Sequence, residues 1–319
     1  MKVVIPGGSG QIGTILARHF HQQGHTVTVL SRVPKAAPWQ VIPWDAQTVG
    51  GWTAALEESD VCINLTGRSV DCRYHTENRR QMYDSRIVST RLLNDVIACL
   101  AHPPRLWLNA STATIYRHAL DRPMDEMTGE LGGNEPGAPD TWNFSISIAK
   151  DWEAAFFAGQ TRNTRRIAMR SSITFIAGKG GVLEILSNLV RSGLGGAQGS
   201  GLQYVSWIHE ADFVRAVDFL IANETLTGPV NICSPNPLRN REFMRALRAS
   251  WRQAVGVAAP SWMIEIGSFL LRTESELVLK SRRVIPGRLL NAGFCFTYLE
   301  WAAAAQELVS RYRRGAKSA

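Results

Sequence analysis

The sequence predicts an α/β fold, a doubly wound parallel sheet followed by a smaller lobe, and three observations lead to this prediction. Short apolar runs alternate with helical patterns through the first two-thirds of the chain, which is typical of βαβ units. The runs are nearly continuous in apolar residues, as expected for strands buried on both faces. After Ser171 the pattern changes to glycine-rich loops and helices. We expect a first domain over residues 1–235, with 171–204 contributing to the smaller lobe, and a mostly helical lobe over 236–315.

The individual elements follow from the same patterns. A helix over 11–23 would follow the first strand, and Gly24 would terminate it. Two longer helices are predicted over 76–99 and 144–157. Strands are predicted over 2–5, 26–31, 60–65, 105–110, 165–171 and 228–233.

The composition indicates a globular protein with reduced cysteines. The 319 residues are 45% hydrophobic and 19% charged, which is ordinary for a globular protein. The chain has neither a signal-peptide pattern nor a long uninterrupted apolar stretch, so we expect a cytoplasmic protein without a membrane partner. The five cysteines are scattered and form no C-x-x-C pair, which favours reduced thiols over disulfides or a metal site.

The net charge of +8 points to an anionic partner. The arginines are spread along the chain rather than grouped in blocks, which argues against a nucleic acid. An anionic small ligand explains the charge more simply.

A glycine-rich turn follows the first strand in the segment "VVIPGGSGQIG". Such a turn between a strand and a helix is the context of the dinucleotide-binding motif. One glycine allows the tight turn, one lets the backbone approach a pyrophosphate, and one lets the helix pack closely. The helix N-terminus then faces the anion. The predicted pyrophosphate site comprises Gly7, Gly8, Ser9, Gly10, Gln11, Ile12 and Gly13.

The end of the second predicted strand selects the cofactor. An acidic residue usually stands there when the cofactor lacks a 2′-phosphate, but this chain has Ser31 and Arg32 instead. A guanidinium suits a phosphate monoester, and the serine adds a hydroxyl donor. Lys35 adds a further charge. The pattern favours NADP over NAD, with an exposed loop arginine as the alternative.

Several motifs occur in an order that resembles a known family. They are the glycine turn, "NLTG" at 64–67, "DSR" at 84–86, "STATIY" at 111–116 and the later "RRVIPGRLLNAGFCF". Together they resemble the extended short-chain dehydrogenase/reductases, the NAD(P)-dependent epimerase/dehydratase superfamily. Within it they are most similar to an epimerase-like subgroup with a small C-terminal domain of unknown function. The resemblance implies a Rossmann-type domain with a smaller substrate lobe.

The resemblance also implies roles for individual residues. Asn64, Leu65, Thr66 and Gly67 would line the cofactor. Thr112 would occupy the superfamily's catalytic Ser/Thr position.

The superfamily's catalytic tyrosine is missing. It should stand four residues before a lysine, but Ile146 stands four before Lys150, and a shift of one residue gives Ser145. A serine is a poor proton donor without an activating base. We expect Lys150 to bind the nicotinamide ribose, and Tyr116 to be the best substitute donor. The alternative for Tyr116 is a packed aromatic. His209 is a second candidate, with a structural role at a helix start as its alternative.

Two functions follow as hypotheses. The first is an NADP(H)-dependent, epimerase-like oxidoreductase acting on an unknown small carbonyl or sugar-like substrate, with Thr112, Tyr116 and Lys150 as catalytic residues. The second is a sensor or interaction protein that binds NADP(H) without turnover.

Overall fold

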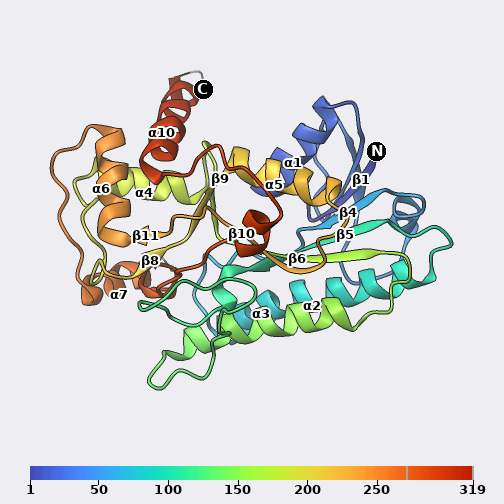
Figure 1. Ribbon diagram of the computed structural model, residues 1–319, viewed down its shortest axis with the longest axis horizontal. Helices are drawn as coiled ribbons and strands as arrows, with labels where there is room; N and C mark the ends of the chain where they lie inside the picture. Colours follow the sequence, from blue (N-terminus) through green and yellow to red (C-terminus); the bar gives the residue numbers. More distant parts are fainter. Residues whose placement is uncertain (271, 318–319) are drawn as a thin grey trace.

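The computed structural model describes residues 1–270 and 272–317. A seven-stranded sheet in the order β10-β6-β5-β4-β1-β2-β3 forms its centre, and every neighbouring pair of strands in it is parallel. Helices cover both faces of the sheet (Figure 1). The predicted Rossmann-type, doubly wound α/β fold is thereby confirmed. The strands are β1 (Lys2–Pro6), β2 (Thr26–Ser31), β3 (Gln40–Pro43), β4 (Val61–Asn64), β5 (Leu106–Thr112), β6 (Arg165–Ser171) and β10 (Gly228–Ile232).

Each face of the sheet has its own apolar core. On one face, Leu16 and Phe20 of α1 (Gln11–Gln22) pack with Phe213 and Leu220 of α5 (Glu210–Ala222) against the strands. The other face is covered by α2 (Thr76–Cys99) and α3 (Asp140–Ala158). Because both faces are buried, the strands must be apolar throughout, as their sequences are.

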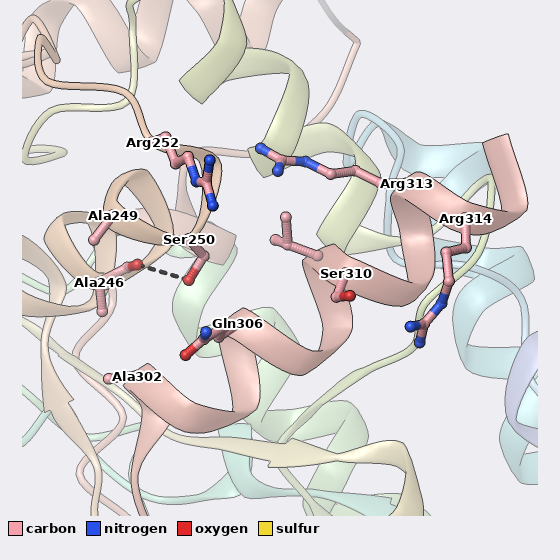
Figure 2. A pocket seen from close by; sticks show the side chains of 10 residues that line it. Ala246, Ala249, Ser250, Arg252, Ala302, Gln306, Ser310, Arg313 and Arg314 are labelled. Atoms are coloured by element: carbon pink, nitrogen blue, oxygen red, sulfur yellow. Dashed lines mark hydrogen bonds between the residues drawn. The ribbon is translucent and has the colours of Figure 1, made fainter. Parts of the chain in front are cut away.

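A third core joins segments that are far apart in the sequence. It combines α4 (Val182–Arg191), α6 (Asn240–Trp251) and α10 (Trp301–Lys317) around Phe243 and Trp301, whose rings stack at 4.2 Å between centroids. Between α6 and α10 a pocket of about 550 Å³ remains open (Figure 2).

Shorter elements complete this part of the chain. They are β7 (Ile173–Phe175), β8 (Tyr204–Val205), β9 (Trp207–His209), β11 (Leu238–Arg239), α7 (Ser261–Leu270), α8 (Glu276–Leu279) and α9 (Gly287–Asn291). Two 3-10 turns, η1 (Gly51–Ala55) and η2 (Ala113–Ile115), follow β3 and β5. None of the helices over the described residues is long and apolar enough to cross a membrane.

Candidate functional site

The predicted cofactor residues gather at one edge of the sheet. Gly7, Arg32, Leu65 and Thr112 lie at or just after the carboxyl ends of β1, β2, β4 and β5. These strands are parallel, so their carboxyl ends share an edge. Ligands of open α/β sheets bind at this edge, where the strand order reverses.

The glycine turn combines close packing with open space. Gly7 has φ +73°, and a Cβ there would lie 2.8 Å from the backbone of Leu65 and Thr66. A Cβ on Gly13 would lie 2.4 Å from Gly8. By contrast, a Cβ on Gly10 would meet no heavy atom within 4 Å. Gly10 directly precedes α1, so the open space faces the helix N-terminus and fits a pyrophosphate.

The turn after β4 contains a buried hydroxyl without a partner. The Asn64 side chain is fully buried, donates to Asn109 Oδ1 at 2.7 Å and accepts from the Thr66 backbone N–H at 3.1 Å. This fixes the backbone of Leu65 and Thr66 beside the glycine turn. Thr66 Oγ1 is buried and forms no hydrogen bond among the described residues. A buried polar atom of this kind fits a ligand that completes the site.

The predicted 2′-phosphate residues at the end of β2 differ in their surroundings. Ser31 is buried, and its hydroxyl lies 3.1 Å from both Ser9 Oγ and the Val33 carbonyl oxygen. The Ser31 side chain therefore joins β2 to the glycine turn. Arg32 and Lys35 are exposed, and neither side chain pairs with another group in the part of the chain that the structure describes. Their charges remain available for a phosphate.

Thr112 ends β5, and Lys150 lies on α3, which packs against β5. Thr112 Oγ1 accepts a hydrogen bond from the Thr114 N–H at 3.1 Å and so begins the η2 turn. Lys150 is half-buried and forms no hydrogen bond or ion pair within residues 1–270 and 272–317. A Cβ on Gly133 would lie 3.4 Å from Lys150 Nζ.

Tyr116 is part of a buried network. Its hydroxyl donates to Asn231 Oδ1 at 3.0 Å and accepts from Arg170 at 2.9 Å. Arg170 in turn forms two hydrogen bonds to Glu153, at 2.8 and 2.7 Å. Burial raises the pKa of Tyr116 to about 12. This arrangement fits the alternative role of Tyr116, a packed aromatic residue whose hydroxyl is hydrogen-bonded.

His209 also has structural contacts. Its ring is buried, and Nδ1 accepts from the Ala211 N–H at 3.0 Å at the start of α5. Nε2 lies 2.9 Å from Glu307 on α10. The Tyr298 ring stacks on it at 3.8 Å. These contacts match the alternative of a helix-start histidine.

The structure supplies a partner for Ser145 that the sequence did not reveal. Ser145 Oγ donates to Glu276 Oε2 at 2.5 Å. Glu276 is fully buried and pairs with Arg282 at 3.3 Å. The Arg282 Nε–H donates to Thr114 Oγ1 at 3.0 Å, which links the pair to the η2 turn after Thr112. Burial raises the pKa of the Glu276 carboxyl, opposed by the charge of Arg282.

Lys280 adds a second buried ionisable group to this cluster. Its Nζ donates to the Thr114 carbonyl oxygen at 2.7 Å, and the residue is 1% exposed. Burial lowers the pKa of Lys280 to about 7, with a further contribution from Arg282. No short motif contains Glu276 or Lys280, so only the fold reveals them.

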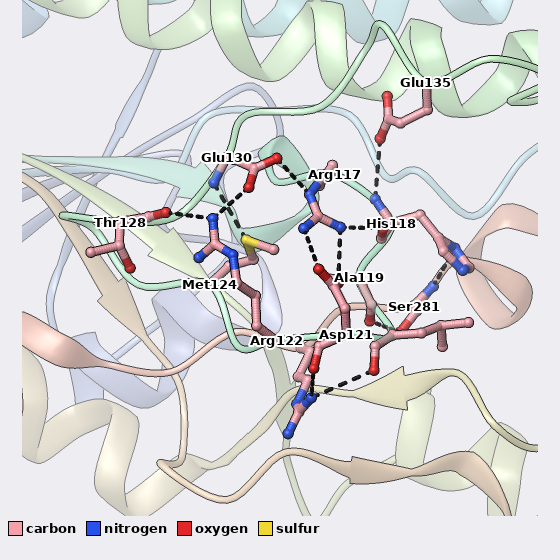
Figure 3. Close-up of polar contacts among 12 residues, drawn as sticks. Arg117, His118, Ala119, Asp121, Arg122, Met124, Thr128, Glu130, Glu135 and Ser281 are labelled. Atoms are coloured by element: carbon pink, nitrogen blue, oxygen red, sulfur yellow. Dashed lines mark hydrogen bonds and ion pairs between the residues drawn. The ribbon is translucent and has the colours of Figure 1, made fainter.

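A loop after Tyr116 contacts both this C-terminal segment and α3 (Figure 3). Arg117 forms ion pairs with Asp121 and Glu130, which closes the loop on itself. The Ser281 N–H donates to His118 Nδ1 at 3.2 Å. The imidazole of His118 stacks on Trp142 of α3. The segment that carries Glu276 and Lys280 is thereby held beside α3.

Comparisons with known proteins agree with this architecture. The model of the NAD dependent epimerase/dehydratase family matches residues 3–233, and a domain of unknown function (DUF1731) matches residues 259–308. An epimerase family protein of Mycobacterium leprae is 31% identical over 298 residues, covering 92% of this chain and 91% of that protein. The human epimerase family protein SDR39U1 is 29% identical over 314 residues, covering 97% of this chain and all of that protein.

A solved structure extends the comparison to the fold. The crystal structure of human SDR39U1 (isoform 2) with NADPH has a TM-score of 0.84 and 28% identity, covering 97% of this chain and 99% of that one. The family match spans most of the chain and includes the glycine turn, the β4 turn and the Thr112 segment. On this evidence, the chain belongs to the NAD-dependent epimerase/dehydratase family.

Proposed function

We propose that the protein is an NADP(H)-dependent, epimerase-like oxidoreductase that reduces a small carbonyl or sugar-like substrate. The observation that carries the proposal is the open space at Gly10, together with Arg32 and Lys35 after β2, two cations that have no partner among the described residues. No carboxylate stands at the end of β2 to repel a 2′-phosphate or bind a ribose. The NADPH bound in the human relative supports the same choice.

Different residues of the chain bind different parts of the cofactor. The glycine turn holds the pyrophosphate, and Arg32 with Lys35 binds the 2′-phosphate. Thr66 Oγ1 offers its unused hydrogen-bonding capacity to the cofactor. Lys150, which lacks a partner among the described residues, binds the ribose hydroxyls of the nicotinamide half. The bound cofactor supplies the hydride.

The proton comes from Ser145 with Glu276 as its partner. Thr112 orients the substrate's carbonyl oxygen. With Glu276 protonated, its carboxyl donates to Ser145 Oγ while the serine O–H faces the substrate oxygen. Ser145 then gives its proton to that oxygen and takes the proton of Glu276, so Ser145 ends neutral and Glu276 ends as a carboxylate. This step requires the protonated form of Glu276; burial raises the pKa of its carboxyl, while the charge of Arg282 opposes the shift.

Titration with NADPH and NADH, followed by a carbonyl screen, tests the proposal. We expect tighter binding of NADPH and oxidation of NADPH by at least one carbonyl compound or nucleotide sugar. Binding of NADPH without oxidation by any compound would contradict catalysis.

The second candidate is a sensor that binds NADP(H) without turnover, favoured by the hydrogen-bonded hydroxyl of Tyr116. It predicts a protein partner whose capture changes with NADPH. Pull-downs with identical partners in the presence and absence of NADPH would exclude it.

A further inference from the structure

The pocket between α6 and α10 contains none of the residues assigned to the cofactor site. Its volume of about 550 Å³ falls in the range of about 300–1,000 Å³ that small-molecule sites occupy. Figure 2 shows the two helices on either side of it. The lining residues are Ala246, Ala249, Ser250, Arg252, Ala302, Gln306, Val309, Ser310, Arg313 and Arg314.

The charge of the pocket has one sign. Three of the lining residues are arginines and none is acidic. The Arg252 side chain is exposed and forms no hydrogen bond or ion pair with any residue that the structure describes. A guanidinium has five N–H donors, so Arg252 offers all of them to a ligand.

Arg313 is held in place by Trp251. One of its N–H groups donates to the Trp251 carbonyl oxygen at 3.1 Å, and its guanidinium carbon lies 4.5 Å from the centroid of the indole. Trp251 is itself fixed, because its Nε1–H donates to Ser187 Oγ at 3.0 Å. A guanidinium fixed in this way loses little conformational freedom when an anion binds.

The backbone of Arg252 is unusual for an arginine. It ends α6 in the left-handed conformation, with φ 57° and ψ 35°, a position where glycine is the usual residue. Left-handed backbone is unfavourable for a residue with a Cβ. Glycine adopts this conformation freely, so it can replace Arg252 without backbone strain.

The rest of the pocket suits an organic molecule attached to the anion. Ala246, Ala249, Ala302 and Val309 give an apolar surface, while Ser310 and Gln306 add neutral hydrogen-bonding groups. We propose that this pocket binds a small phosphorylated organic molecule, with Arg252 and Arg313 holding its phosphate group. A pocket of about 550 Å³ between two helices fits a small ligand better than an extended nucleic-acid strand.

Calorimetric titration of the NADPH-saturated protein with glycerol 3-phosphate and inorganic pyrophosphate tests the proposal. Saturating NADPH keeps the cofactor's own phosphate sites occupied. We expect saturable binding of one equivalent of each probe. The double variant Arg252→Gly/Arg313→Gln should bind both probes about tenfold more weakly or worse, because it loses charge-assisted hydrogen bonds. The control Arg241→Ala removes an exposed arginine on α6 that does not line the pocket, and should bind both probes as the wild type does.

The single variant Arg252→Gly separates ligand binding from folding. Glycine adopts the left-handed conformation freely, so the melting temperature of the Arg252→Gly protein should stay level or rise by about 1–3 °C. Its binding of the phosphate probes should weaken. The proposal is overturned if neither probe binds, or if Arg252→Gly binds as tightly as Arg241→Ala. It is also overturned if the pocket arginines bind single-stranded RNA that neither probe displaces.

Discussion

Ser145 and Glu276 form a 2.5 Å hydrogen bond between positions 131 residues apart in the sequence. Ser145 stands on α3 beside the position where the superfamily's tyrosine is expected, and Glu276 comes from the C-terminal segment. The serine thereby gains the acid–base partner that a hydroxyl needs to transfer a proton. The C-terminal segment thus contributes Glu276 to the proposed site.

The first prediction concerns this pair. Ser145→Ala should lower kcat about 10²-fold or more on the carbonyl substrate that the screen identifies, since a general acid contributes that much. The dissociation constant for NADPH should stay unchanged, because Ser145 acts on the substrate. Ser147→Ala is the matched control: its exposed hydroxyl lies on the same helix and donates to the Phe144 carbonyl oxygen. Equal rates in the two variants would contradict the role of Ser145, and Ser145→Thr should restore part of kcat.

The second prediction concerns the choice of cofactor. Arg32→Asp should weaken NADPH binding about 10–100-fold, because it removes the charge-assisted contacts and adds a repelling carboxylate. NADH has no 2′-phosphate and should lose much less affinity. Arg18→Asp makes the same charge change at an exposed residue farther along α1 and should affect both cofactors equally. Calorimetric titration measures both affinities, and equal losses in Arg32→Asp would refute the assignment of NADP.

The sequence predicted the buried elements better than the exposed ones. The apolar runs at 26–31 and 165–171 coincide with β2 and β6, and the helix over 76–99 has the predicted bounds. β3 (Gln40–Pro43) was missed because it is short, half exposed and ends in a proline. The helix over 144–157 begins earlier, at Asp140, after Pro139 at its N-cap.

The predictability of the site depends on where its residues lie in the sequence. The glycine turn is local, so its spacing and its place between a strand and a helix can be read from the sequence, and its binding of a cofactor stays a prediction. The phosphate-binding role of Ser31 stays a prediction, and the contact of its hydroxyl with Ser9 across 22 residues depends on the fold. The Ser145–Glu276 pair depends on how the C-terminal segment packs on α3, which no local pattern encodes.

The third prediction compares two glycines of the same turn. Gly13→Ala should destabilise the protein by about 1–3 kcal/mol, because the added Cβ would lie 2.4 Å from the Gly8 backbone. Gly10→Ala has room for its Cβ and an extended backbone, φ −76° and ψ 175°, so it should fold with a loss of at most about 1 kcal/mol. Its methyl group would occupy the proposed pyrophosphate space and abolish NADPH binding. Urea unfolding and NADPH titration check both, and normal NADPH affinity in Gly10→Ala would contradict the site.

The fourth prediction tests Tyr116. Tyr116→Phe removes the hydroxyl that contacts Asn231 and Arg170, leaving buried polar groups without this partner. It should lower the free energy of unfolding by about 1–3 kcal/mol. Below its melting temperature the variant should keep kcat within about threefold of the wild type, far less than the loss of a general acid. A drop in kcat of the size expected for Ser145→Ala would return Tyr116 to the role of proton donor.

The fifth prediction concerns the pH dependence of stability. Lys280 has a folded-state pKa of about 7 against an unfolded value of 10.5. Between these values the unfolded chain binds a proton that the folded chain does not, so this residue makes stability rise with pH, by up to about 1.4 kcal/mol per unit. Lys280→Met removes the titrating group and keeps most of the apolar volume. Relative to wild type, the variant should therefore be most stabilised near pH 7 and progressively less so toward pH 10. Urea unfolding of both proteins at pH 7, 8, 9 and 10 measures the difference, and a constant difference would show that Lys280 stays charged in the folded protein.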